Sequence, residues 1–180
     1  MRGDFIFLLF LPCILCMIEN LDDNYDTIIE FKEDNVTVSG EIGVEYDGTR
    51  VNITESGSYL VTGICDEGTI NIYSHSVNLY LDNLELSSSI TSPIYISKHL
   101  KDIKIIALNN VNISDYEEID SSGGDCAAIK IKKKSSVSFY SHNTFYINST
   151  CKNAIKGASQ ATLTFEDCSG KYRIDSFFNG

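Results

Sequence analysis

A four-residue step that returns along the chain constrains its fold more than any other feature. The step reads Thr-Ile-Asn-Ile at 69–72, Pro-Ile-Tyr-Ile at 93–96, Ala-Ile-Lys-Ile at 128–131 and Ala-Ile-Lys-Gly at 154–157. Its leading isoleucines are residues 70, 94, 129 and 155, so the intervals are 24, 35 and 26 residues. Self-similarity with a period of about 20 to 50 residues is typical of stacked structural repeats.

Two further pairs of alternating apolar residues follow each step. The first pairs are Leu79/Leu81, Ile103/Ile105, Val137/Phe139 and Leu163/Phe165, and the second are Leu84/Leu86, Val111/Ile113, Phe145/Ile147 and Tyr172/Ile174. Alternation with a period of two indicates strands with one buried face. Three short strands per unit of about 25 residues predict an all-β chain, folded as a right-handed single-stranded parallel β-helix. The alternative is an antiparallel β-sandwich, which also has short strands but no reason to return to an Ala-Ile-Lys step.

The predicted β-helix domain covers residues 35–180. The long interval accommodates an acidic, Gly- and Ser-rich insertion at 114–125, which predicts a projecting loop. Residues 19–34 are acidic and predict an irregular N-terminal arm. The next step is due near position 181, so we expect a domain that is truncated at this end and can self-associate through its open last coil.

The chain begins with features of a secretory protein. A short start containing Arg2 precedes an apolar run from Phe5 to Ile18, which is short for a membrane span and predicts a signal peptide over residues 1–18. An uncleaved anchor is the alternative. Four glycosylation sequons begin at Asn35, Asn52, Asn112 and Asn148. Together they predict a secreted or cell-surface glycoprotein without membrane insertion after signal cleavage.

Four cysteines remain once the predicted signal is removed: Cys65, Cys126, Cys151 and Cys168. Cys126 and Cys151 lie three and four residues before their leading isoleucines, which places them together on adjacent coils and predicts a disulfide. The partners of Cys65 and Cys168 stay open.

Charge and exposed residue types limit the function. A net charge of −11 argues against nucleic acid as a partner. Lys130 and Lys156 occupy equivalent outward positions, and we expect them, with Lys132, Tyr95 and Tyr146, to contact a carbohydrate. The alternative is that these lysines only neutralise the surface and prevent sheet association. No acidic pair recurs on one face of adjacent coils, so we predict that the protein is not an enzyme.

Several segments carry a family resemblance over about 130 of the 180 residues. The segments are ITESGSYLVTG at 53–63, VNLYLDNLELSS at 77–88, TSPIYI at 91–96, AAI at 127–129 and NAIKG at 153–157. In order and spacing they resemble the β-helical carbohydrate-binding proteins of plant-cell-wall-degrading bacteria. The resemblance implies binding of polygalacturonate or cellulosic material and a role for calcium.

The chain departs from this family at the turns that carry acidic residues there. The matching positions read Lys152-Asn153-Ala154-Ile155 and Phe178-Asn179-Gly180, and Asn is a weaker calcium ligand than a carboxylate. The sequence therefore requires no cofactor, and calcium is a candidate only. Its remaining candidate ligands, which are otherwise solvated surface carboxylates, are Asp120, Asp125, Asp167 and Asp175.

These observations predict a secreted, non-catalytic module that recognises a pectic or cellulosic polysaccharide. A surface adhesin or structural glycoprotein is the alternative. A polysaccharide lyase, which would use a lysine base beside calcium, is less favoured.

Overall fold

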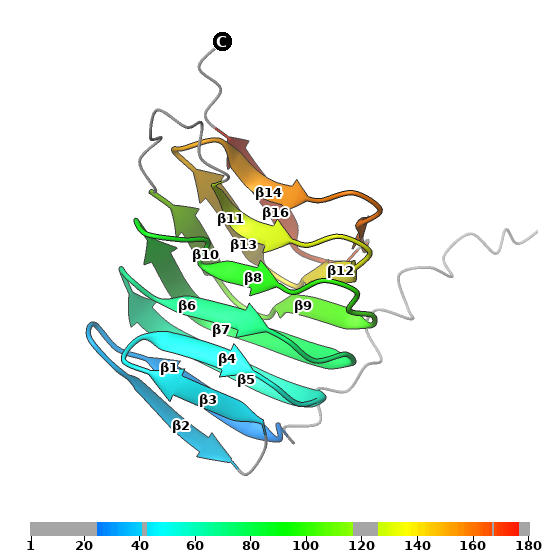
Figure 1. Cartoon of the computed structure of the whole chain (residues 1–180). Coiled ribbons are helices and arrows are strands. Elements are labelled where there is room, and N and C mark those ends of the chain that lie inside the picture. Colours follow the sequence, from blue (N-terminus) through cyan, green and yellow to red (C-terminus); the bar gives the residue numbers. More distant parts are fainter. Residues whose placement is uncertain (1–24, 41–42, 117–125, 167, 177–180) are drawn as a thin grey trace, which may run out of the picture.

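The computed structural model describes residues 25–40, 43–116, 126–166 and 168–176. In this part of the chain all regular elements are β-strands, arranged in two sheets that face each other (Figure 1). The predicted signal peptide, most of the predicted 114–125 loop and residues 177–180 lie outside the described residues.

The smaller sheet contains the recurring step seen in the sequence. Its strands are, in spatial order, β14 (Asn153–Gly157), β11 (Ala127–Ile131), β8 (Ile94–Ile96), β6 (Thr69–Ile72), β4 (Arg50–Ile53) and β3 (Val44–Asp47). Ile70, Ile94, Ile129 and Ile155 are successive partners on parallel strands, which confirms the predicted stacking. The first three are fully buried because each is covered by the isoleucines beside it and by the opposite sheet.

The larger sheet contains the other two strands of each repeat. Its strands are β1 (Thr27–Phe31), β2 (Val36–Gly40), β5 (Gly57–Cys65), β7 (Val77–Ser88), β9 (Ile103–Ala107), β10 (Val111–Asp115), β12 (Ser136–Ser141), β13 (Thr144–Ser149), β15 (Thr162–Phe165) and β16 (Lys171–Ser176). Two branches leave β7, one through β9, β12 and β15 and the other through β10, β13 and β16. All these neighbours are parallel, and within the described residues antiparallel pairing is confined to β1–β2 and β3–β4. The antiparallel sandwich is therefore wrong.

The register of the sheet agrees with the sequence pattern except at one place. Leu84 pairs with Val111, as the pattern predicts. Leu79, which the pattern places beside Ile103, instead pairs with Ile105, and Val77 takes the predicted position. A slip of two residues leaves the same side chains facing the core, so alternation alone does not distinguish the two registers.

Strand β7 runs without a break through Leu79/Leu81 and Leu84/Leu86, which the sequence presents as two separate strands. Asp82 pairs with Thr62 and Leu84 pairs with Gly63, so Asn83 is an extra residue in this strand. Asn83 has a φ of 47°, a left-handed conformation that Asn tolerates better than most residues. A β-bulge accommodates one such residue by bending the strand without ending it.

The N-terminal arm is more regular than expected. Within the segment 19–34, Thr27–Phe31 forms strand β1, whose alternate side chains Thr27, Ile29 and Phe31 are buried. The strand pairs with both β2 and β5. Acidic flanking residues obscure this short alternating run in the sequence, but three buried side chains suffice to place it against the core.

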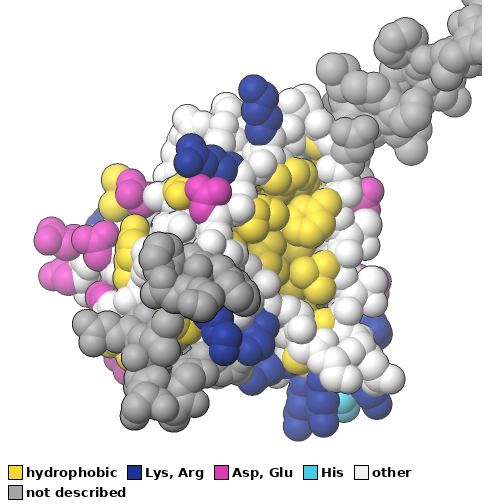
Figure 2. Space-filling view, turned by 90° about the horizontal axis from the view of Figure 1, so that it is seen from above, with side chains coloured by type: hydrophobic (Ala, Val, Ile, Leu, Met, Phe, Trp, Pro, Cys, Tyr) yellow, Lys and Arg dark blue, Asp and Glu magenta, His cyan; other side chains and the backbone are white. Residues whose placement is uncertain are grey.

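The opposite end of the molecule exposes apolar side chains. Phe165 and Ile174, on the last strands of the two branches, are 43% and 44% exposed. Figure 2, viewed toward this end, shows hydrophobic side chains gathered on the surface. Self-association through this end stays a prediction.

Candidate functional site

The outer face of the smaller sheet carries a ladder of polar and aromatic side chains. Asn52, Asn71, Tyr95, Lys130 and Lys156 are successive partners on β4, β6, β8, β11 and β14. Each lies next to a core isoleucine in its strand and therefore points outward. We call these five residues the outer ladder.

The lower part of the outer ladder is held together by amide hydrogen bonds. Asn71 Nδ2 donates to Asn52 Oδ1 at 3.0 Å and to the Val51 carbonyl oxygen at 3.4 Å. Stacked asparagines on parallel strands form such bonds because their amides repeat at the strand spacing. This end of the ladder therefore presents an ordered row of amides.

Tyr95 is the aromatic centre of the outer ladder. Its ring lies 6.3 Å from the ring of Tyr73, at an interplanar angle of 52°. Lys132 Nζ lies 5.8 Å from the Tyr95 ring centroid, within range of a cation–π interaction. Burial, and then the neighbouring Tyr73, raise the pKa of Tyr95, so its hydroxyl stays a neutral hydrogen-bond donor.

A pocket of about 470 Å³ opens beside Tyr95. Its lining residues are Tyr95, Ser97, Lys98, Lys132, Lys133 and Ala158. Lys98 and Lys133 are exposed and lie in the segments that follow β8 and β11. We call this pocket the tyrosine–lysine site.

The tyrosine–lysine site is basic although the chain is acidic. Three of its six lining residues are lysines, and none of the six is acidic. Because the protein as a whole carries −11, this local excess of positive charge singles out one surface region. An aromatic face with several ammonium groups beside it can bind a ring that carries a carboxylate or another anionic group.

Comparison with protein families identifies the family of the chain. Residues 47–180 match the model of the family described as carbohydrate-binding domain-containing protein. The chain belongs to this family. The match spans the outer ladder and the tyrosine–lysine site, and it indicates that the protein binds carbohydrate. Neither the curated proteins nor the solved structures provide a match.

Most of the residues that the sequence predicts to contact a carbohydrate lie together on the outer face of the smaller sheet. Tyr95, Lys130 and Lys156 share the outer ladder, and Lys132 lies against Tyr95. Tyr146 lies elsewhere, on β13 in the larger sheet. There its ring is 5.0 Å from the Arg173 guanidinium, and burial together with a hydrogen bond to Asp175 raises its pKa.

Two lysines that line the candidate site, Lys98 and Lys133, were not predicted from the sequence. Lys98 and Lys133 lie in turns, where strand alternation gives no direction for a side chain. Tyr73 follows β6 directly, and it approaches Tyr95 because parallel strands place consecutive repeats side by side. A search for lysines just after each core step would have found both lysines.

The predicted calcium ligands do not form a site within the described residues. Asp120, Asp125 and Asp167 lie outside them. The Asp175 carboxylate accepts a hydrogen bond from Arg173 Nε at 3.1 Å, an ion pair that competes with a cation. Among the four predicted ligands, only the surroundings of Asp175 are described, and its ion pair with Arg173 does not favour calcium.

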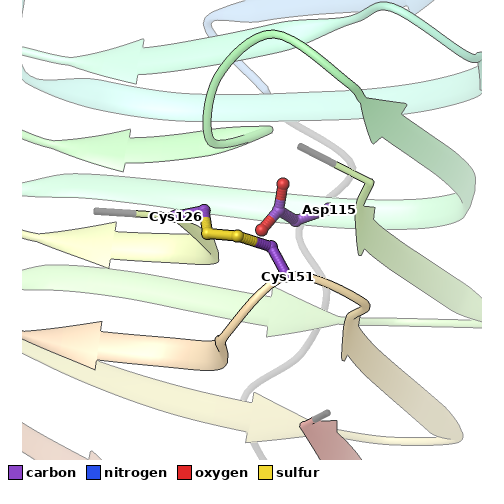
Figure 3. Close-up of side chains that lie close together, drawn as sticks. All are labelled: Asp115, Cys126 and Cys151. Carbon is purple, nitrogen blue, oxygen red and sulfur yellow. A yellow bond between two sulfur atoms is a disulfide. The ribbon is translucent and has the colours of Figure 1, made fainter. Parts of the chain in front are cut away.

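Another group of metal-binding residue types lies in the interior. Asp115, Cys126 and Cys151 bring their ligand atoms within 4.8 Å of one another (Figure 3). Cys126 and Cys151 form the disulfide that the sequence predicts, with their Cα atoms 6.2 Å apart. Thiolates, not disulfide sulfurs, are the usual metal ligands, so this pair is structural. Asp115 Oδ2 accepts a hydrogen bond of 2.9 Å from Ser149 Oγ, which helps to satisfy the buried carboxylate.

Cys65 and Cys168 carry thiols in the structure. Cys65 is buried in β5, and burial raises the pKa of its thiol, which disfavours the reactive thiolate. In the described part of the chain, no helix has the length and apolar character needed to cross a membrane.

Proposed function

We propose that the protein is a secreted, non-catalytic module that binds an acidic polysaccharide of the pectic class through the tyrosine–lysine site. The observation that carries this proposal is the pocket in which Tyr95 lies beside Lys98, Lys132 and Lys133. A pyranose ring packs on the aromatic face while its carboxylate meets the ammonium groups. The excess of lysines favours uronate polymers over neutral cellulose.

The proposed scaffold is a right-handed single-stranded parallel β-helix. Its support is the parallel register that joins each unit to the next in both sheets, from β6 to β8 to β11 to β14 in the smaller one. A chain that repeats one path around a common axis produces parallel neighbours at every strand. Such a scaffold places equivalent outward positions in straight rows, and the outer ladder is one of them.

The proposal also includes that the protein is extracellular and glycosylated, and that it binds its polysaccharide without calcium. The apolar N-terminal run and the four sequons support the secretory route. The ion pair of Asp175 with Arg173 supports binding without calcium. Direct contact between lysine and carboxylate needs no bridging cation.

A binding experiment with three polymers tests the proposal. Polygalacturonate, its methyl ester and cellulose are offered to the full chain, with and without chelator. We expect affinity for polygalacturonate that falls as salt rises, little affinity for the ester, and no effect of chelator. Equal binding of the acid and its ester would show that the lysines do not read charge, and release of an unsaturated uronate would show a lyase.

Substitutions locate the binding on the surface. Lys132→Ala/Lys133→Ala should weaken binding of polygalacturonate by about 2 kcal/mol, roughly thirtyfold, if each lysine makes one charge-assisted hydrogen bond. Lys104→Ala is the matched control, because Lys104 Nζ also lies near a tyrosine ring, 5.9 Å from the Tyr140 centroid, but on the larger sheet. A control that loses as much affinity as the double variant would place the binding elsewhere.

A further inference from the structure

The outer face of the larger sheet has a hollow of its own, with a volume of about 440 Å³. It lies over strands β7, β10 and β13, which are adjacent in Figure 1. A second row of outward side chains crosses it, formed by Ile64, Glu85, Asn112, Tyr146 and Arg173 as successive partners. The hollow is therefore separate from the tyrosine–lysine site, which lies on the other sheet.

Asn112 lies in the middle of this row and begins the sequon Asn112-Ile113-Ser114. Ser114 Oγ donates a hydrogen bond of 3.0 Å to Asn112 Oδ1, which fixes the orientation of the side-chain amide. Among the described residues, Asn112 Nδ2 has no hydrogen-bond partner, and Asn112 lines the hollow. The atom that an N-linked sugar modifies is thus available in a space large enough for sugar rings.

Tyr146, next to Asn112 in the row, and Ile64, which lies beyond Glu85 on the other side, suit the apolar faces of sugar rings. Tyr146, the next residue in the row, is braced by the Arg173 guanidinium at 5.0 Å, and Arg173 is held by Asp175 at 3.1 Å. At the other end of the hollow, Ile64 is 61% exposed, one of the largest exposures of an apolar side chain in the described chain. A braced aromatic ring and an uncovered isoleucine beside a sequon form a surface that an attached glycan can cover.

The other sequons lack this setting. Asn35 is exposed in the turn before β2 and does not line the hollow. Asn52 lies in the outer ladder on the smaller sheet and does not line the hollow. Asn148 lies on the outer face of β13 but does not line the hollow. Asn112 is thus the sequon whose first sugars would meet prepared protein surface.

We propose that Asn112 carries an N-linked glycan whose first sugars lie in the hollow against Tyr146 and Ile64. The donor is an oligosaccharide on a lipid pyrophosphate. Asn112 Nδ2 forms a bond to the C1 atom of the first sugar, the bond from C1 to the pyrophosphate oxygen breaks, and the amide proton is lost as the lipid pyrophosphate departs. The protein's own glycan then covers the larger sheet, and external polysaccharide is left with the smaller one.

The test uses the full chain secreted from a eukaryotic host that performs N-glycosylation. Glycopeptide mass spectrometry reads the occupancy of Asn112 and Asn35, and an endoglycosidase that cuts near the protein is then applied to the folded and the denatured protein. In the folded protein we expect cleavage at Asn112 to be about tenfold slower than at Asn35, a difference that vanishes on denaturation. An unmodified Asn112, or equal cleavage rates at the two sites in the folded protein, would overturn the proposal.

A variant separates packing of the glycan from its mere presence. Tyr146→Ala keeps the sequon but removes the aromatic surface, and cleavage at Asn112 should approach the rate at Asn35. Tyr140→Ala is the control, since Tyr140 also points outward from the larger sheet but does not line the hollow. If Tyr146→Ala leaves the slow cleavage unchanged, the glycan does not lie on this ring. If either variant fails to fold, the comparison of cleavage rates at Asn112 and Asn35 in the wild type is sufficient to test the proposal.

Discussion

The Cys126–Cys151 disulfide should contribute a measurable and calculable part of the stability. It closes a loop with a sequence separation of 25 residues and joins the segments that precede β11 and β14. For a loop of this length, the loss of chain entropy in the unfolded state corresponds to about 3.5 kcal/mol at 25 °C. We therefore expect Cys126→Ala/Cys151→Ala to lower the free energy of unfolding by about 3 kcal/mol.

Urea unfolding with and without a dithiol reductant measures this contribution. Reduction should destabilise the wild type by a similar amount and leave the double variant unchanged, while the urea dependence steepens because the unfolded chain expands. Cys65→Ala is the control. This variant keeps the Cys126–Cys151 disulfide, so its stability should respond to reductant as fully as that of the wild type. A response of the wild type below about 1 kcal/mol, or an equal response in the double variant, would refute the reasoning.

Substitutions at three further residues test the core, the close strand contact and the pH response. Ile129→Ala should lower the free energy of unfolding by about 2 to 5 kcal/mol and Ile129→Val by about 1 kcal/mol, measured by urea unfolding, because this side chain is fully buried; equal losses would contradict stacking. Gly63→Ala should destabilise the protein in the same assay, because Gly63 has a φ of 106° and a Cβ there would overlap the Phe31 carbonyl; a neutral change would show that the strands can separate. Burial, followed by the charge of Glu55, raises the pKa of Tyr59 to about 12, so the neutral phenol stabilises the fold fully below about pH 10 and progressively less as pH rises toward 12. Tyr59→Phe should remove that part of the pH dependence of stability, and an unchanged profile would assign it to another group.

The buried half of the structure could be predicted from the sequence because the core allows few alternatives. Ile70, Ile94, Ile129 and Ile155 recur at intervals that only a repeating path brings into register, and the structure pairs them as predicted. The disulfide followed from the same alignment, since its cysteines occupy similar positions in consecutive units. Residues recur from repeat to repeat where their side chains must pack against the equivalent side chains of the adjacent repeats.

Features that break the repeat could not be predicted in the same way. The two-residue slip of Leu79 keeps the same face buried, and the bulge at Asn83 has the composition of an ordinary turn. The tyrosine–lysine site was predicted in part: Tyr95 and Lys132 follow from strand direction, whereas Lys98 depends on the path of a turn. Local sequence propensity predicts individual strands. A site formed by two repeats also depends on how the turns of both repeats lie relative to each other.

The side chains of the outer ladder are regularly spaced along the smaller sheet. Parallel strands are about 4.8 Å apart, so the residues from Asn52 to Lys156 form a graduated row in which each added strand advances by the same amount. A sugar polymer lying across the strands would meet a new side chain at each advance, amides first and ammonium groups last. Adding or deleting one repeat would lengthen or shorten this recognition tract by a fixed increment, without disturbing the chemistry of the repeats that remain.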